Sequence, residues 1–246
     1  MSKEQGAWAI DKEKRMLQAS EDLEKAARAG DEEKIKDALG RGGNPNHMGR
    51  FGHPPLWLCA DAGHAHCMEA LVNAGARLNS GGHGSVTPLA AAASGGHIES
   101  MKELFRLGAS VEGQARTMST PLIWLAQSAP DNLMAAQLLI AHGANHLCRD
   151  EFGSSVLDYL ARSQRIGSGG GEALAMLIMG MGADPREAQP GKRSPLDEAR
   201  RMGEGSAMFQ AFQAFAQALS DREALESLPM GVDGLPGPAK ASAPRL

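Results

Sequence analysis

Histidine and cysteine residues in the first third of the chain are of the types that bind zinc. His64, His66 and Cys67 fall within four positions, and Cys59 lies eight residues before Cys67. Four imidazole or thiolate ligands make a tetrahedral zinc site. The alternative is that both cysteines are buried and inert, because a free cysteine in a core behaves as a small apolar side chain. We favour this alternative, since the repeat pattern described below supports it, and we expect no metal or other cofactor.

The sequence contains no motif that indicates catalysis or nucleotide binding. The glycine-rich run at residues 167–171 lacks the Gly-Lys-Ser/Thr ending that places a lysine on phosphates, and no strand pattern precedes it. We interpret it as a connection between two helices. Ser/His/Asp and Cys/His sets at catalytic spacing are also absent. We therefore expect a protein that is not an enzyme, with a cryptic catalytic or metal site in the second repeat as the alternative.

The composition argues against a nucleic-acid or membrane partner. The 246 residues are 42% hydrophobic and carry a formal net charge of −4, so a core can form while the chain as a whole repels polyanions. The longest apolar stretch, residues 173–183, is too short and too rich in glycine to span a bilayer. Three cysteines without framework spacing suit reduced thiols. We expect a cytoplasmic protein.

A repeat of about 33 residues organises the chain. Leucines recur in steps of 33, 33, 33, 35 and 39 residues, and a second series of glycines follows them. The two series are Leu23, Leu56, Leu89, Leu122, Leu157 and Leu196, and Gly42, Gly75, Gly108, Gly143 and Gly182. Every glycine lies 14 residues before the next leucine, so the length varies only between leucine and glycine. A period of this size indicates a solenoid of stacked units.

Each unit is predicted to contain two short helices. An alanine-rich run follows each leucine, and then comes an amphipathic run such as Ile98, Met101, Leu104 and Phe105, with helical spacing. The glycine after this run can adopt the left-handed conformation that ends a helix. The constant link keeps neighbouring units in register, whereas insertions between the two helices of one unit disturb the stack little.

These residues resemble the ankyrin repeat family, whose unit carries a Thr-Pro-Leu-His-x-Ala pattern. Thr87-Pro88-Leu89 and Thr120-Pro121-Leu122 match the first half of that pattern, and Gly63-His64 and Gly96-His97 match the family's Gly-His turn. The segment 150–155 matches its Asp-x-x-Gly-x-Thr finger. The resemblance implies an all-α ankyrin-repeat α-solenoid of stacked helix-turn-helix units joined by finger loops.

The resemblance also implies positions for individual residues. Cys59 takes the alanine position of a first helix and Cys67 an apolar position of a second helix, so both face the core, and His64 is the turn histidine. The family's own histidine is replaced in all six units, by Glu24, Trp57, Ala90, Ile123, Asp158 and Asp197. Its hydrogen bonds must therefore be lost or made by other residues.

The repeats are expected to form one domain with an extension at each end. We place an N-terminal extension, which could be helical, at 1–19, the repeat domain at 20–228, and a disordered tail rich in Pro, Gly and Ala at 229–246. The units are predicted near residues 20–50, 51–83, 84–116, 117–151, 152–190 and 191–228. The second helix of the first unit is highly charged, which suits a polar end cap.

The family resemblance implies a binding surface on the concave side, made by the fingers and by the exposed ends of the first helices. Six of its predicted residues are arginines, which can hold carboxylates with two hydrogen bonds. We therefore predict binding of another protein, with an acidic segment, by an inhibitor, adaptor or targeting factor. The predicted residues are Arg28, Arg50, Phe51, His53, Asp61, His83, Arg116, Gln127, Glu151, Phe152, Arg162, Arg193 and Arg201.

Three alternatives remain open at this point. The arginine-rich face could bind nucleic acid, which the net charge disfavours. Trp57 and Trp124 could anchor a partner or pack in place of the missing histidines, and we favour packing. The apolar stripe of Phe209, Phe212 and Phe215 could close the core, which we favour, or form a homodimer.

Overall fold

The computed structural model describes residues 3–50, 52–82, 86–113, 120–129, 131–163 and 171–226, and the side chains of all these except 3–10, 163, 225 and 226. Within these ranges the chain forms twelve α-helices and one 3-10 turn. The described residues form no strand, and their one β-type pairing is an isolated bridge between Arg149 and Ser155. The predicted all-α solenoid of helix pairs is confirmed.

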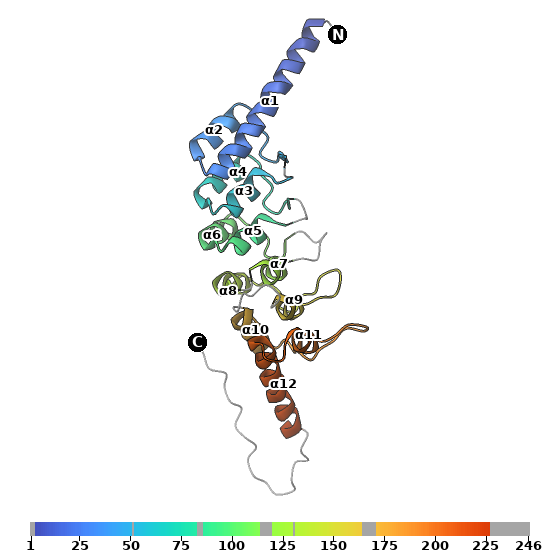
Figure 1. Ribbon diagram of the computed structural model, residues 1–246. Helices are drawn as coiled ribbons and strands as arrows, with labels where there is room; N and C mark the ends of the chain where they lie inside the picture. Colours follow the sequence, from blue (N-terminus) through green and yellow to red (C-terminus); the bar gives the residue numbers. More distant parts are fainter. Residues whose placement is uncertain are drawn as a thin grey trace.

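The helices form two columns that run the length of the molecule (Figure 1). The first helices of the pairs are α1 (Lys3–Ala29), α3 (Pro55–Asp61), α5 (Pro88–Gly95), α7 (Pro121–Ser128), α9 (Val156–Ser163) and α11 (Pro195–Met202). The second helices are α2 (Glu32–Gly40), α4 (Met68–Asn73, after the 3-10 turn Ala65–Cys67), α6 (Ile98–Arg106), α8 (Leu133–Ala141), α10 (Gly171–Gly180) and α12 (Ala207–Glu226). Each first helix packs against the next first helix, which makes one continuous core.

Four of the first helices, α3, α5, α7 and α11, begin at proline, and the last three of these have a side-chain cap, as the sequence predicts. The hydroxyl of Thr87 accepts a hydrogen bond from the backbone N–H of Ala90 at 3.2 Å, and that of Thr120 accepts one from Ile123 at 3.3 Å. The proline that follows each threonine occupies the first turn, where its missing N–H has no helical partner. Short alanine-rich segments can therefore start a helix at a fixed position.

The second helices end at the glycine series. Gly75, Gly108 and Gly143 have φ values of 93°, 93° and 90°, in the left-handed region. At Gly108 the following residue, Ala109, donates its N–H to the carbonyl of Leu104 at 2.9 Å, and the same bond recurs in the other units. This is the hydrogen-bonding pattern of a Schellman motif. The predicted role of these glycines is confirmed.

Hydrogen bonds between units join the turn of one unit to the first helix of the preceding unit. His64 Nε2 lies 3.2 Å from the carbonyl oxygen of Arg28, and His97 Nε2 lies 2.8 Å from that of Asp61. Asn132 takes the same place one unit later and donates to the carbonyl of Ala93 at 3.3 Å. The turn of each of these units therefore caps the end of the preceding first helix, where carbonyls lack helical partners.

The N-terminal extension and the first helix of the first unit form one helix. The boundary predicted between residues 19 and 20 falls inside α1, without a break. Residues 11–18 are exposed, and burial begins at Ala19. In Figure 1 the start of α1 projects beyond the stack. The proposed tail at 229–246 and several unit boundaries, near residues 51, 83 and 116, lie outside the described residues, so the division into units stays a prediction.

The C-terminal phenylalanine stripe closes the core. Phe212 is fully buried and Phe209 is 5% exposed, while Phe215 packs partly buried against the same cluster. The preferred packing interpretation is confirmed. The alternative, a homodimer through Phe209, Phe212 and Phe215, stays a prediction, although Phe209 and Phe212 expose little surface to a second copy.

Candidate protein-binding face

We call the surface made by the finger loops and the exposed ends of the first helices the finger face. The predicted helix residues of this face occupy equivalent places in successive units. Arg28, Asp61, Gln127, Arg162 and Arg201 each lie near the C-terminal end of a first helix, and all five are exposed. Because the first helices stack side by side (Figure 1), these equivalent positions follow one another along the stack, and we call them the row.

A pocket of about 320 Å³ in the second unit brings several predicted residues together. It is lined by Arg28, His53, Trp57, Asp61 and neighbouring atoms of α3. The rings of His53 and Trp57 stack with their centroids 3.8 Å apart. Trp57 therefore packs against the core, as the sequence analysis favours, and it also lines the pocket, while its role as an anchor for a partner stays a prediction. Trp124 is partly exposed in α7.

A second pocket, of about 600 Å³, lies at the other end of the finger face. Arg162, Gly191, Lys192, Arg193 and Glu198 line it. Glu198 is 9% exposed, and its carboxylate accepts a hydrogen bond from Arg201 at 2.6 Å. The Arg201 hydrogen bond is the main cause that lowers the pKa of Glu198 below its ordinary value, and Arg162 and Arg193 add to it through their charge. Three predicted arginines thus converge on one carboxylate.

The finger tips are only partly described. Arg50 is exposed and makes no ion pair with the described residues. Glu151 is exposed, and Phe152 is 67% exposed at the tip of its finger. Phe51, His83 and Arg116, which were predicted to belong to this face, lie outside the described residues. The structure therefore places seven of the thirteen predicted residues in two pockets and one row, and Arg50, Glu151 and Phe152 outside them. Binding of a partner by these residues stays a prediction.

The finger that carries Glu151 and Phe152 is built around Asp150. The Asp150 carboxylate accepts hydrogen bonds from the backbone N–H groups of Phe152 at 2.9 Å and Ser154 at 2.7 Å, and from the hydroxyl of Tyr159 at 2.5 Å. Burial raises the pKa of Tyr159 to about 12, and the hydrogen bond to Asp150 adds to the shift. This network joins the finger to α9 and so fixes the position of the residues below the exposed tip.

The titration of Tyr159 tests this network directly, because the chain contains a single tyrosine. We expect its phenol to ionise near pH 12 in the folded protein, and near pH 10 in urea. A raised folded pKa means that the folded state holds the proton more tightly, so its contribution to stability is lost as the pH rises from about 10 to about 12. Absorbance at 295 nm measures the ionisation. In the Asp150→Asn variant the folded midpoint should fall, and an unchanged midpoint would contradict the role of Asp150.

Two residues of the C-terminal pocket were missed from the sequence. Lys192 directly precedes Arg193 in the finger, and Glu198 lies one helical turn before Arg201. The i,i+3 spacing on α11 is a signal for an ion pair. The convergence of Arg162 on the same carboxylate carries no local signal, because it depends on the contact between α9 and α11.

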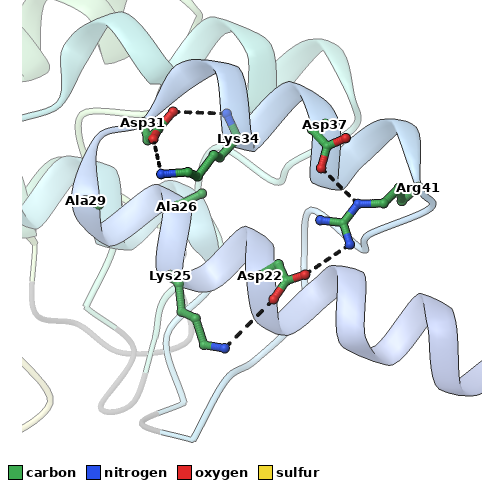
Figure 2. Close-up of a pocket in the computed structure, with 8 residues that line it drawn as sticks. All are labelled: Asp22, Lys25, Ala26, Ala29, Asp31, Lys34, Asp37 and Arg41. Carbon is green, nitrogen blue, oxygen red and sulfur yellow. Dashed lines mark hydrogen bonds and ion pairs between the residues drawn. The ribbon is translucent and has the colours of Figure 1, made fainter.

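A third pocket, of about 460 Å³, lies between α1 and α2 at the N-terminal end and is drawn in Figure 2. Its three carboxylates and three cations pair with one another. Asp22 pairs with Lys25 and Arg41, Asp37 with Arg41, and Asp31 with Lys34, as the dashed lines show. A charge-balanced and exposed surface is what an end unit of a repeat stack requires. We therefore assign this pocket to the polar cap.

The residues of the alternative zinc site are engaged in packing. Cys59 and Cys67 are fully buried, and the Cys59 thiol donates to the carbonyl of Ala27 at 3.4 Å. The hydrogen bond with Cys67 and burial raise the pKa of Cys59, whereas the same hydrogen bond lowers the pKa of Cys67 to about 7. His64 and His66 contact carbonyls of the preceding unit. In the described part of the chain no group of three or more His, Cys, Asp or Glu residues is placed to hold a metal.

The fold and this face define the chain as a helical repeat protein with an extended surface along one side. Residues 23–115 match the family model for ankyrin repeats, in three copies. These residues therefore carry ankyrin repeats, and helix pairs continue beyond them to α12. Ankyrin repeats are generally protein-interaction modules and are typically not enzymes. No curated protein matches the chain. None of the described helices is long and apolar enough to cross a bilayer.

Proposed function

We propose that the protein binds another protein through the finger face, and that the bound segment is acidic. In this role it acts as an inhibitor, adaptor or targeting factor, without catalysis of its own, in the cytoplasm. The observation that carries the proposal is the set of exposed polar side chains at equivalent helix ends, three of which are arginines (Arg28, Arg162 and Arg201), with a pocket near Arg28 and another near Arg162. Arginine is enriched at interface hot spots and binds carboxylates through a planar fork of donors.

The chemistry of the two pockets supports an extended ligand. The pocket of the second unit offers a stacked aromatic pair beside one cation and one carboxylate, Arg28 and Asp61. The pocket of the sixth unit offers mostly cations. A peptide or protein surface that covers both would meet apolar and mixed charge at one end and positive charge at the other. Such a gradient fixes the orientation of a bound segment.

Affinity capture with two charge-matched variants tests the proposal. The finger-face variant replaces Arg28, Arg50 and Arg193 by alanine. The control variant replaces three cations of the second helices α2 and α6 by alanine: Lys36, Lys102 and Arg106. Both lose three positive charges. We expect the finger-face variant to lose at least about tenfold in affinity for the proteins that the unmodified chain captures, and the control to retain them. Equal capture by both variants, with helical circular dichroism preserved, would contradict the proposal.

A further inference from the structure

The pocket of the sixth unit differs in charge from the pocket between α1 and α2. In the pocket of Figure 2 three carboxylates balance three cations. In the sixth unit Arg162, Lys192 and Arg193 share the pocket with a single carboxylate, Glu198. That carboxylate already forms its shortest bond with a fourth cation, Arg201, at 2.6 Å. The pocket therefore holds positive charge that its own residues do not neutralise.

The nearby acids do not neutralise this charge either. Glu187 lies 3.1 Å from Arg149, and the carboxylate of Asp158 accepts hydrogen bonds from the backbone N–H and hydroxyl of Ser155. Within the described ranges neither Arg162 nor Lys192 forms an ion pair. Arg193 reaches Glu198 only at 3.9 Å, and its side chain is 65% exposed. Three cationic groups thus face solvent from α9 and from the finger before α11.

Glu198 is engaged mainly by Arg201. Its side chain is 11% exposed, and it bonds Arg201 through both oxygens, at 2.6 Å and 3.3 Å. These bonds fix the position of Arg201, while Arg162, Lys192 and Arg193 remain exposed in the lining of the pocket. The three exposed cations are therefore accessible to a ligand on the finger face.

We propose that this pocket binds the phosphoryl group of a phosphorylated serine or threonine in the partner protein. The proposal rests on the proposed function, because it names the part of the partner that the C-terminal end of the finger face recognises. A single carboxylate offers one charge and two oxygens. A phosphoryl group offers up to two charges and three acceptor oxygens. With Arg162, Lys192 and Arg193 all available, the phosphoryl group satisfies the donors that one carboxylate leaves unused.

A titration with short peptides tests this assignment on the full chain. Three acetylated and amidated pentapeptides, Gly-Gly-X-Gly-Gly with phosphoserine, glutamate or serine at X, are added to the protein, and chemical shifts of the residue 191–193 amides and of the arginine side chains are followed by NMR. We expect the phosphoserine peptide to bind at least about tenfold more tightly than the glutamate peptide, and the serine peptide not to bind. Equal binding of the glutamate and phosphoserine peptides would overturn the proposal.

Variants assign the binding to this pocket. Arg193→Ala and Arg162→Ala should each lower the affinity for the phosphoserine peptide at least about fivefold, because each removes one charge-assisted contact. Arg77→Ala removes an exposed arginine of another unit and should leave the affinity unchanged. Phosphopeptide affinity that is insensitive to both pocket variants would also overturn the proposal. If the phosphopeptide does not bind while the finger-face variant still loses its captured proteins, this inference fails and the proposed function stands.

Discussion

Replacement of Phe212 by alanine should lower the free energy of unfolding by about 3–5 kcal/mol. Phe212 is the largest of the fully buried side chains, and it lies on α12 where that helix packs against α10 and α11. Removing the ring takes away its burial and leaves a cavity that rigid helix pairs cannot fill. Since α12 closes the stack, the loss should appear first as unfolding of the last unit. Urea denaturation followed by circular dichroism measures the change.

A matched exposed residue provides the control. Met176 lies on α10 with 51% of its surface exposed, so Met176→Ala should change the free energy of unfolding by less than about 0.5 kcal/mol. If Phe212→Ala were as mild as Met176→Ala, then α12 would not pack on the solenoid as the structure shows. The unmodified chain could instead show a molecular mass that rises with its concentration. If that rise were absent in Phe212→Ala, the phenylalanine stripe would be identified as a dimer interface.

Replacement of Gly43 by alanine should destabilise the first unit by about 1–3 kcal/mol. A Cβ atom at Gly43 would lie 2.8 Å from the carbonyl oxygen of Ala38 and 3.0 Å from that of Ala19. Both are backbone atoms of helices, so neither can move without shifting α1 or α2. The N–H of Gly43 also donates to the Ala38 carbonyl at 2.9 Å, which fixes the close approach. Thermal denaturation would measure the effect.

Gly40 is the appropriate comparison for Gly43. It ends α2 three residues earlier, and a Cβ atom there meets nothing within 4 Å. Gly40→Ala should therefore be neutral or stabilise the protein by up to about 1 kcal/mol, because alanine has the higher helix propensity. Equal destabilisation by the two substitutions would show that glycine is required for backbone flexibility and not for the contact between α1 and α2.

Local signals in the sequence were sufficient for the fold. The leucine and glycine series predicted the helix pairs because each marks a local event: a proline-capped helix start, or a glycine at a helix end. Those events depend on a few neighbouring residues, so they can be predicted without knowledge of the tertiary structure. The packing of Cys59 and Cys67 followed from their positions in the repeat, that of Phe212 was the favoured interpretation of an apolar helical stripe, and the structure buries all three.

Contacts between units were beyond local signals. His64 and His97 were expected at turns, but their hydrogen bonds to carbonyls of the preceding unit depend on how the units stack. The pocket around Glu198 is a contact of the same kind, because its cations come from α9 and from the next finger. The continuity of α1 across residue 19 was missed because the charged segment before it has no regular apolar spacing. A pattern that recurs in every unit predicts the structure of the unit. The residues that share a surface are known only from the way the units stack.

Hydrogen exchange of the protein with and without a captured partner tests the central claim most directly. That claim is that the finger face contacts the partner while the second helices do not. We expect slower exchange of the finger amides around residues 48–54 and 187–195 and of the helix ends near Arg28 and Arg162. Exchange in α4, α6 and α8 should remain unchanged. The claim would be contradicted if only the amides of these second helices exchanged more slowly with the partner bound, while the finger amides exchanged as in the free protein.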